Sequence, residues 1–143
     1  MKSIRHIVLI DDNRTTHCLS QHLIKNFDPC IQISPFINGG SALAYFRGLS
    51  NSLNRRFCSV PDLVILDINM PDMSGWQVLE AFEAMELFKK HHIEVLMLTS
   101  SEYAEDLAKS REYSLCKGYL TKPLTLQKLS TEFKNLRNGS LTG

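Results

Sequence analysis

The chain is short of the features that mark several common classes of protein. Its four cysteines (Cys18, Cys30, Cys58 and Cys116) show no CxxC spacing and no nearby histidine pair. Neither a disulfide framework nor a zinc site is therefore indicated, and we interpret the cysteines as reduced thiols. No apolar run approaches the length of a membrane span, and the run at 7–10 is too short for a secretory signal. We expect a cytoplasmic protein that has no membrane partner.

An excess of charge of one sign is also lacking. The sequence holds 16 Lys and Arg against 15 Asp and Glu, for a formal net charge of +1. A nucleic-acid partner is not favoured, because proteins that bind one usually carry a strongly basic face. At 143 residues the chain is long enough for one domain with its own core.

What the sequence does contain is a regular alternation of two patterns. Apolar segments at 6–10, 31–36, 63–66, 94–99 and 118–121 predict strands, and their nearly continuous apolar character is typical of strands covered on both faces. Amphipathic segments at 14–27, 41–49, 74–90, 103–114 and 124–137 predict helices. The alternation predicts an α/β fold with a parallel sheet and helices on both faces.

One connection is longer than this plan requires. Residues 48–61 are polar and rich in turn formers, and we interpret them as a surface loop that contains at most a short helical turn. Residues 138–143 have the composition of a frayed end. We expect a single domain over 1–143, with its core at about 6–137, and we find no repeat or linker to a second domain.

Polar residues follow most of the predicted strands. Asp11 and Asp12 follow the first strand, Asp67 the third, Thr99 the fourth and Lys122 the fifth. Each has an ordinary explanation as a helix cap, a turn residue, a strand former or a solvated lysine. The carboxyl ends of parallel strands meet at one edge of the sheet, where ligands bind in open α/β folds. That coincidence favours a functional site.

Electrostatics makes a bound cation at this edge plausible. Two carboxylates about 4 Å apart repel each other by roughly 4 kcal/mol at an effective dielectric constant near 20. Three such groups require either proton uptake or a cation, and Mg²⁺ suits a site of few carboxylates plus waters. A cation beside Lys122 is also what a phosphoryl group requires, and Asp67 is then placed to form an acyl phosphate as a nucleophile.

The motifs IDDN, LDINMPDMSG, MLTSS and GYLTKPL, in this order, resemble those of response-regulator receiver domains of two-component signalling. The chain is similar to the chemotaxis-type, stand-alone receivers, and the resemblance runs from Ile7 to about Leu136. It implies a flavodoxin-like fold in which five parallel strands are arranged in the order 2-1-3-4-5.

The resemblance also implies the roles of the acidic residues. It makes Asp67 the phospho-acceptor, Asp12 a direct Mg²⁺ ligand and Asp11 an acid that holds the metal largely through water. The backbone carbonyl of Asn69 would complete the metal shell.

The remaining site residues would sense the phosphoryl group. Thr99 and Lys122 would contact its oxygens, and Tyr119 would be the switch aromatic, which turns inward when Thr99 moves. The bond before Pro123 would be cis. Ser100 would leave room for the phosphoryl group, and Ser101, like Asn69, would influence the lifetime of the acyl phosphate.

We therefore expect a switch that accepts a phosphoryl group from a histidine kinase or a histidine phosphotransfer protein, as a monomer or weak dimer. It would catalyse only its own phosphorylation and dephosphorylation, and its output would be binding to another protein. A phosphorelay intermediate, a receiver fragment of a hybrid kinase and a pseudo-receiver remain as alternatives. A haloacid-dehalogenase-like phosphatase is less favoured because it wants an acid at the position of Asn69, and a flavodoxin because two acids follow the first strand.

Overall fold

The computed structural model of the chain describes residues 3–100 and 108–137. Its centre is a five-stranded sheet in the order β2-β1-β3-β4-β5, and all neighbouring strands are parallel. The strands are β1 (His6–Ile10), β2 (Gln32–Phe36), β3 (Leu63–Asp67), β4 (Glu94–Thr99) and β5 (Cys116–Thr121). The predicted fold class and strand order are confirmed.

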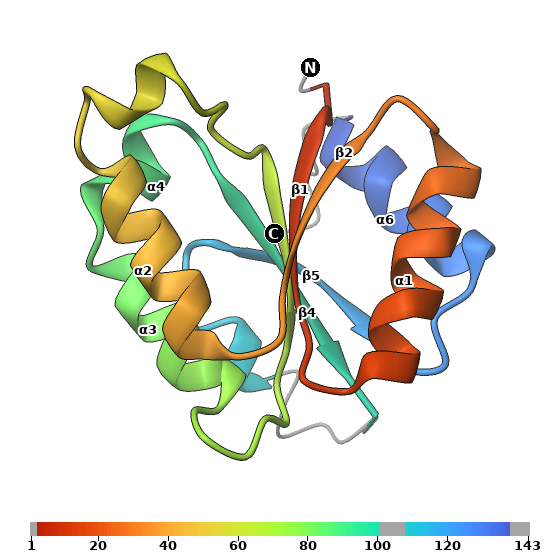
Figure 1. Cartoon of the computed structure of the whole chain (residues 1–143). Helices are drawn as coiled ribbons and strands as arrows, with labels where there is room; N and C mark the ends of the chain where they lie inside the picture. The colour runs from red at the N-terminus through yellow and green to blue at the C-terminus, as the bar shows by residue number, and fades with distance from the viewer. Residues whose placement is uncertain (1–2, 101–107, 138–143) are drawn as a thin grey trace.

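Helices cover both faces of the sheet (Figure 1). Helices α1 (Arg14–Phe27) and α6 (Leu126–Arg137) lie on one side. Helices α2 (Gly39–Leu49), α3 (Gly75–Glu83) and α4 (Glu86–Lys90) lie on the other. The predicted surface loop at 48–61 contains the short 3₁₀ helix η1 (Asn54–Arg56). No helix in the described residues is both long and apolar enough to cross a bilayer.

The strand sequences are apolar at successive positions because the sheet has a core on each side. In β1, Ile7 and Leu9 pack with the residues of α1 and α6, whereas Val8 and Ile10 pack with those of α2, α3 and α4. Successive side chains of a strand point to opposite faces, so a strand covered on both faces is apolar throughout. This packing holds the strand ends, and the residues that follow them, in fixed positions.

Two predicted helices differ from those observed by more than a residue or two at their ends. The helix predicted at 74–90 is wrong as one element, because it breaks into α3 and α4 at Ala84 and Met85. The helix predicted at 103–114 lies partly outside the described residues; 108–110 are helical, and turns surround Tyr113 before β5. The predicted tail at 138–143 lies wholly outside them.

Candidate phosphoryl and metal site

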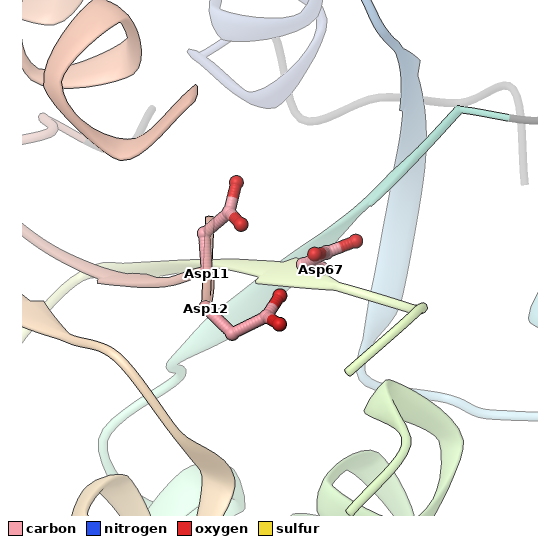
Figure 2. Close-up of side chains that lie close together, drawn as sticks. All are labelled: Asp11, Asp12 and Asp67. Carbon is pink, nitrogen blue, oxygen red and sulfur yellow. The ribbon is translucent and has the colours of Figure 1, made fainter. Parts of the chain in front are cut away.

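The strand register brings the predicted acids together at the carboxyl edge of the sheet. Ile10 of β1 pairs with Leu66 of β3, so Asp11 and Asp67 are the next residues of adjacent strands. The carboxylates of Asp11, Asp12 and Asp67 offer ligand atoms that all lie within 4.8 Å of one another. Figure 2 shows Asp11 and Asp12 at the end of β1, with Asp67 beside them on β3.

Local hydrogen bonds show which of the residues after β1 caps α1 and which are left for the site. Asn13 caps α1, because its Oδ1 accepts a hydrogen bond of 3.0 Å from the backbone N–H of Thr16. Asp11 Oδ1 accepts one of 3.0 Å from the backbone N–H of Asn13. The cap is therefore supplied by the asparagine, and the carboxylate of Asp12 remains available to the site.

Lys122 reaches the acids from the other side. Its Nζ lies 3.4 Å from Asp11 Oδ2 and 3.4 Å from Asp67 Oδ2. Its backbone N–H donates a hydrogen bond of 2.7 Å to the carbonyl of Thr99, which ties the end of β5 to the end of β4. The Lys122–Pro123 peptide bond is cis, as the sequence resemblance implied. One ammonium therefore faces two buried carboxylates.

The site holds more negative charge than Lys122 alone can neutralise. Asp11 is fully buried and Asp67 is 2% exposed. Burial, followed by the charge of Asp11, raises the pKa of Asp67 to about 7, even though Lys122 and the backbone N–H of Asn69 lower it; that N–H donates to Oδ1 at 3.2 Å. At neutral pH Asp67 is thus only partly ionised, and an added positive charge would favour its anion.

The residues present fit a hard divalent cation. All three groups offer oxygen, the ligand atom that Mg²⁺ prefers. Asp11 Oδ2 is buried and accepts no hydrogen bond from the described residues. Within the described residues, its negative charge is offset by the Lys122 ammonium. Such an oxygen gains more from a cation than one already saturated with hydrogen bonds. The structure therefore supports a metal site, as the sequence predicted.

The other predicted residues lie around this cluster. Thr99 is fully buried at the end of β4 and pairs in register with Thr121, whereas Ser100 is exposed. Tyr119 is half-buried on β5, packed against the core between the sheet and α3. Asn69 is exposed in the turn after β3, and Ser101 lies outside the described residues. The structure thus places Thr99 at the rim beside Asp67 and Tyr119 two residues before the rim.

Gly75, which sequence reasoning did not single out, also shapes the site. A Cβ atom at this position would lie 2.4 Å from the backbone oxygen of Asp67 and 2.7 Å from Ile68 Cα. The backbone N–H of Gly75 donates a hydrogen bond of 2.8 Å to the carbonyl of Ile68. Helix α3 can therefore begin directly against the turn that carries Asp67. The signal in the sequence was a glycine immediately after the capping residue Ser74.

Comparison with known proteins agrees with this geometry. Residues 7–134 match the family of response regulator receiver domains, and the chain therefore belongs to this family. A crystal structure of a two-component response regulator from Cytophaga hutchinsonii superposes with a TM-score of 0.80 and 25% identity, over 96% of this chain and 99% of that one.

The relatives of known function differ in length, and this chain matches only a part of each. Regulatory protein VanRc of Enterococcus gallinarum is 34% identical over 82% of this chain, but the match covers only 43% of VanRc. Chemotaxis protein CheY of Pseudomonas aeruginosa is 32% identical over 52% of this chain and 58% of its own length. Histidine kinase 1 of Arabidopsis thaliana is 35% identical over 44% of this chain and 5% of its own length. The chain thus spans less than two thirds of these relatives.

Proposed function

We propose that the chain is a signalling switch that accepts a phosphoryl group on Asp67 from a histidine kinase or a histidine phosphotransfer protein. The observation that carries this proposal is the convergence of three carboxylates and Lys122 at one sheet edge, with Asp11 and Lys122 both flanking Asp67. Such a site matches the charge of a phosphoryl group and a divalent cation better than it matches any neutral ligand. We place this reaction in the cytoplasm.

The proposed reaction is a transfer between a donor nitrogen and an aspartate oxygen. A carboxylate oxygen of Asp67 forms the new bond to phosphorus while the phosphorus–nitrogen bond of phosphohistidine breaks, and the leaving imidazole nitrogen keeps the electron pair and takes up a proton. Mg²⁺, bound by Asp11, Asp12, Asp67 and the carbonyl of Asn69, would supply compensation for the phosphoryl charge. Lys122 holds a positive charge at the Asp67 carboxylate throughout.

The chain's own residues would then transmit the change. Thr99 and Lys122 follow the phosphoryl oxygens, and because the Lys122 N–H is bonded to the Thr99 carbonyl, the ends of β4 and β5 would shift together. Tyr119, on β5 and next to Met97 of β4, would follow the movement of Thr99. Phosphorylation would shift an existing equilibrium and so alter the binding of another protein.

Two other functions are less well supported. A phosphorelay intermediate, or a receiver segment of a larger kinase, would use the same site, and the match to Histidine kinase 1 is compatible with it. A phosphatase with a nucleophilic aspartate would want a second acid where Asn69 stands. We therefore propose that the chain does not turn over small phosphoesters and modifies only itself.

The test is chemical phosphorylation in the presence of Mg²⁺. Incubation with acetyl phosphate should add one phosphoryl group by intact mass, and hydroxylamine should remove it because acyl phosphates are labile to this reagent. Asp67→Asn should abolish the addition. Asp72→Asn, an exposed carboxylate of the same connection, is the matched control and should be modified like the wild type. Modification that persists in Asp67→Asn, or no modification of the wild type, would sink the proposal.

A further inference from the structure

The long connection between α2 and β3 is fixed to the body of the molecule at both ends. At its start, Arg55 Nη1 donates a hydrogen bond of 2.7 Å to the carbonyl of Leu49, and Asn54 Nδ2 donates one of 2.6 Å to the carbonyl of Gly48. At its end, the Ser59 hydroxyl lies 2.9 Å from Nδ1 of the buried His6. The backbone of the connection is therefore tied to the body of the molecule on both sides of Phe57.

Two apolar side chains project from this anchored connection into solvent. Phe57 is 88% exposed and Leu53 is 59% exposed, the two highest values among the large apolar side chains that the structure describes as exposed. A phenylalanine left in water forgoes the favourable free energy of burial. Aromatic side chains are enriched at protein interfaces, and an anchored backbone lowers the entropy cost of ordering the connection on binding.

The connection that carries the two apolar side chains and the neighbouring end of α4 are both positively charged. No acidic residue occurs between 47 and 61, where η1 ends at Arg56, and α4 ends at the exposed Lys89 and Lys90, just before the α4–β4 turn. Burial is the first cause that lowers the pKa of His91 in that turn, and the positive charge of Arg55 lowers it further. The loop and the turn are therefore within electrostatic reach of each other, and Figure 1 shows both at the same end of the molecule.

These cations are not neutralised within the described part of the chain. Arg56, Lys89 and Lys90 form no ion pair there, although the protein as a whole has a net charge of only +1. We define the distal patch as Leu53, Arg56, Phe57, Lys89 and Lys90. It lies at the amino ends of β3 and β4, whereas Asp67 lies at the carboxyl end of β3, roughly 15 Å away along the strand.

We propose that the distal patch is a docking surface for a protein partner that presents an apolar pocket or ridge bordered by Asp and Glu side chains. Phe57 and Leu53 make the central apolar contact, and Arg56, Lys89 and Lys90 pair with the carboxylates around it. An exposed aromatic side chain with cations at the same end of the molecule suits an interface centre with a charged rim. Because the patch is remote from Asp67, a partner can bind there in both phosphorylation states.

A protein fits this surface better than a membrane or a nucleic acid. An interfacial membrane helix needs several turns with one apolar face, and η1 has three residues. Nucleic acid needs an extended row of cations, and the distal patch holds three. Two apolar side chains with cations at the edge instead fit a protein interface that has an apolar centre and a polar rim.

The test asks which peptides, out of a random library, bind the distal patch. A random twelve-residue peptide library is selected on the immobilised full chain and counter-selected on its Phe57→Ser variant. The enriched peptides should combine Asp or Glu with aliphatic or aromatic residues. The most enriched peptide is then synthesised and titrated by fluorescence anisotropy. Phe57→Ala and the pair Arg56→Glu, Lys90→Glu should each weaken its binding by at least tenfold, and added salt should weaken it several-fold.

Matched variants separate this surface from nonspecific effects. Ile37→Ala, at a side chain 52% exposed elsewhere, and the pair Arg111→Glu, Lys117→Glu, at exposed cations elsewhere, should leave binding within twofold. Asp67→Asn should also leave it unchanged, which keeps the result independent of the phosphoryl site. The proposal is wrong if the enriched peptides are neutral or basic, or if none is enriched. It is also wrong if Phe57-dependent binding is found to vesicles of equal phosphatidylserine and phosphatidylcholine or to duplex DNA.

Discussion

At the scale of single residues, Asp67 combines burial with a nearby like charge, and both oppose its ionisation. The folded-state pKa of about 7 lies above the ordinary value of 3.8, so the folded protein holds this proton more tightly than the unfolded chain does. The stability that Asp67 contributes is therefore fully present below pH 3.8 and is lost as the pH rises through 7. The ionised form of Asp67 therefore destabilises the folded protein unless a further cation binds beside it.

This pKa predicts an unusual effect of removing the charge. In metal-free buffer with a chelator, Asp67→Asn should be more stable than the wild type at pH 8, by about 2 kcal/mol, because it lacks the ionised carboxylate beside Asp11. The difference should shrink towards zero as the pH falls to 4. Urea unfolding at several pH values measures both curves. Parallel curves over this range would show that the carboxylate of Asp67 is not destabilising.

At the scale of elements, the points where helices begin, end and break decide which side chains reach the site and the core. The segment 74–90 has a helical apolar pattern throughout, yet it breaks at Met85, which has an extended backbone. Phe82 and Phe88 are both fully buried and stack at 4.3 Å. In one continuous helix six residues turn through about 600°, so these rings would point about 120° apart. The break turns α4 so that both rings enter the same core, and the local pattern could not show it.

The contact between α3 and the turn after β3 gives a prediction about Gly75. Gly75→Ala should destabilise the protein by about 3 kcal/mol, because its Cβ would press on backbone atoms of Asp67 and Ile68 that cannot move aside cheaply. It should also slow phosphorylation of Asp67 by acetyl phosphate, because that turn carries the acceptor.

Gly40→Ala is the matched control within a helix. Its Cβ would meet no described atom closer than Asn38 Oδ1, at 3.6 Å, so it should be neutral or stabilising by about 0.5 kcal/mol. Denaturant unfolding of both variants checks the pair. Equal stabilities would mean that α3 does not depend on close approach at Gly75.

At the scale of the whole molecule, the carboxyl edge of the sheet brings residues at the ends of β1, β3 and β5 into one charged cluster. A ligand that binds this cluster only in the folded state must stabilise the entire domain. At a free Mg²⁺ concentration 100 times its dissociation constant the gain is about 2.7 kcal/mol. For a domain of this size this corresponds to a rise of about 8 °C in the melting temperature.

Removal of the metal should therefore be visible in thermal unfolding. The melting temperature of the wild type should rise with added Mg²⁺ and return to its original value after chelation. Asp12→Asn should lose most of this rise, because it removes a proposed ligand, whereas Asp72→Asn should keep it. The fluorescence of Trp76, the single tryptophan, which is half-buried and stacked on Tyr113 at 6.0 Å, follows the transition. A rise of the same size in Asp12→Asn would contradict the assigned ligand set.

The order of apolar and polar residues was enough to establish the class of fold, the five strands and the residues that follow them. Periodicity is a local property that locates the strands. Because parallel strands end at one edge of the sheet, it also predicts that the residues after them lie close together. Distances are not local. The packing of the folded chain alone decided that Lys122 lies equally far from Asp11 and Asp67, and that Phe57 faces water while Phe82 and Phe88 stack. Lys122 meets Asp67 because segments 55 residues apart pack together, and the two rings meet because the core turns α4 against α3; the apolar pattern encodes neither.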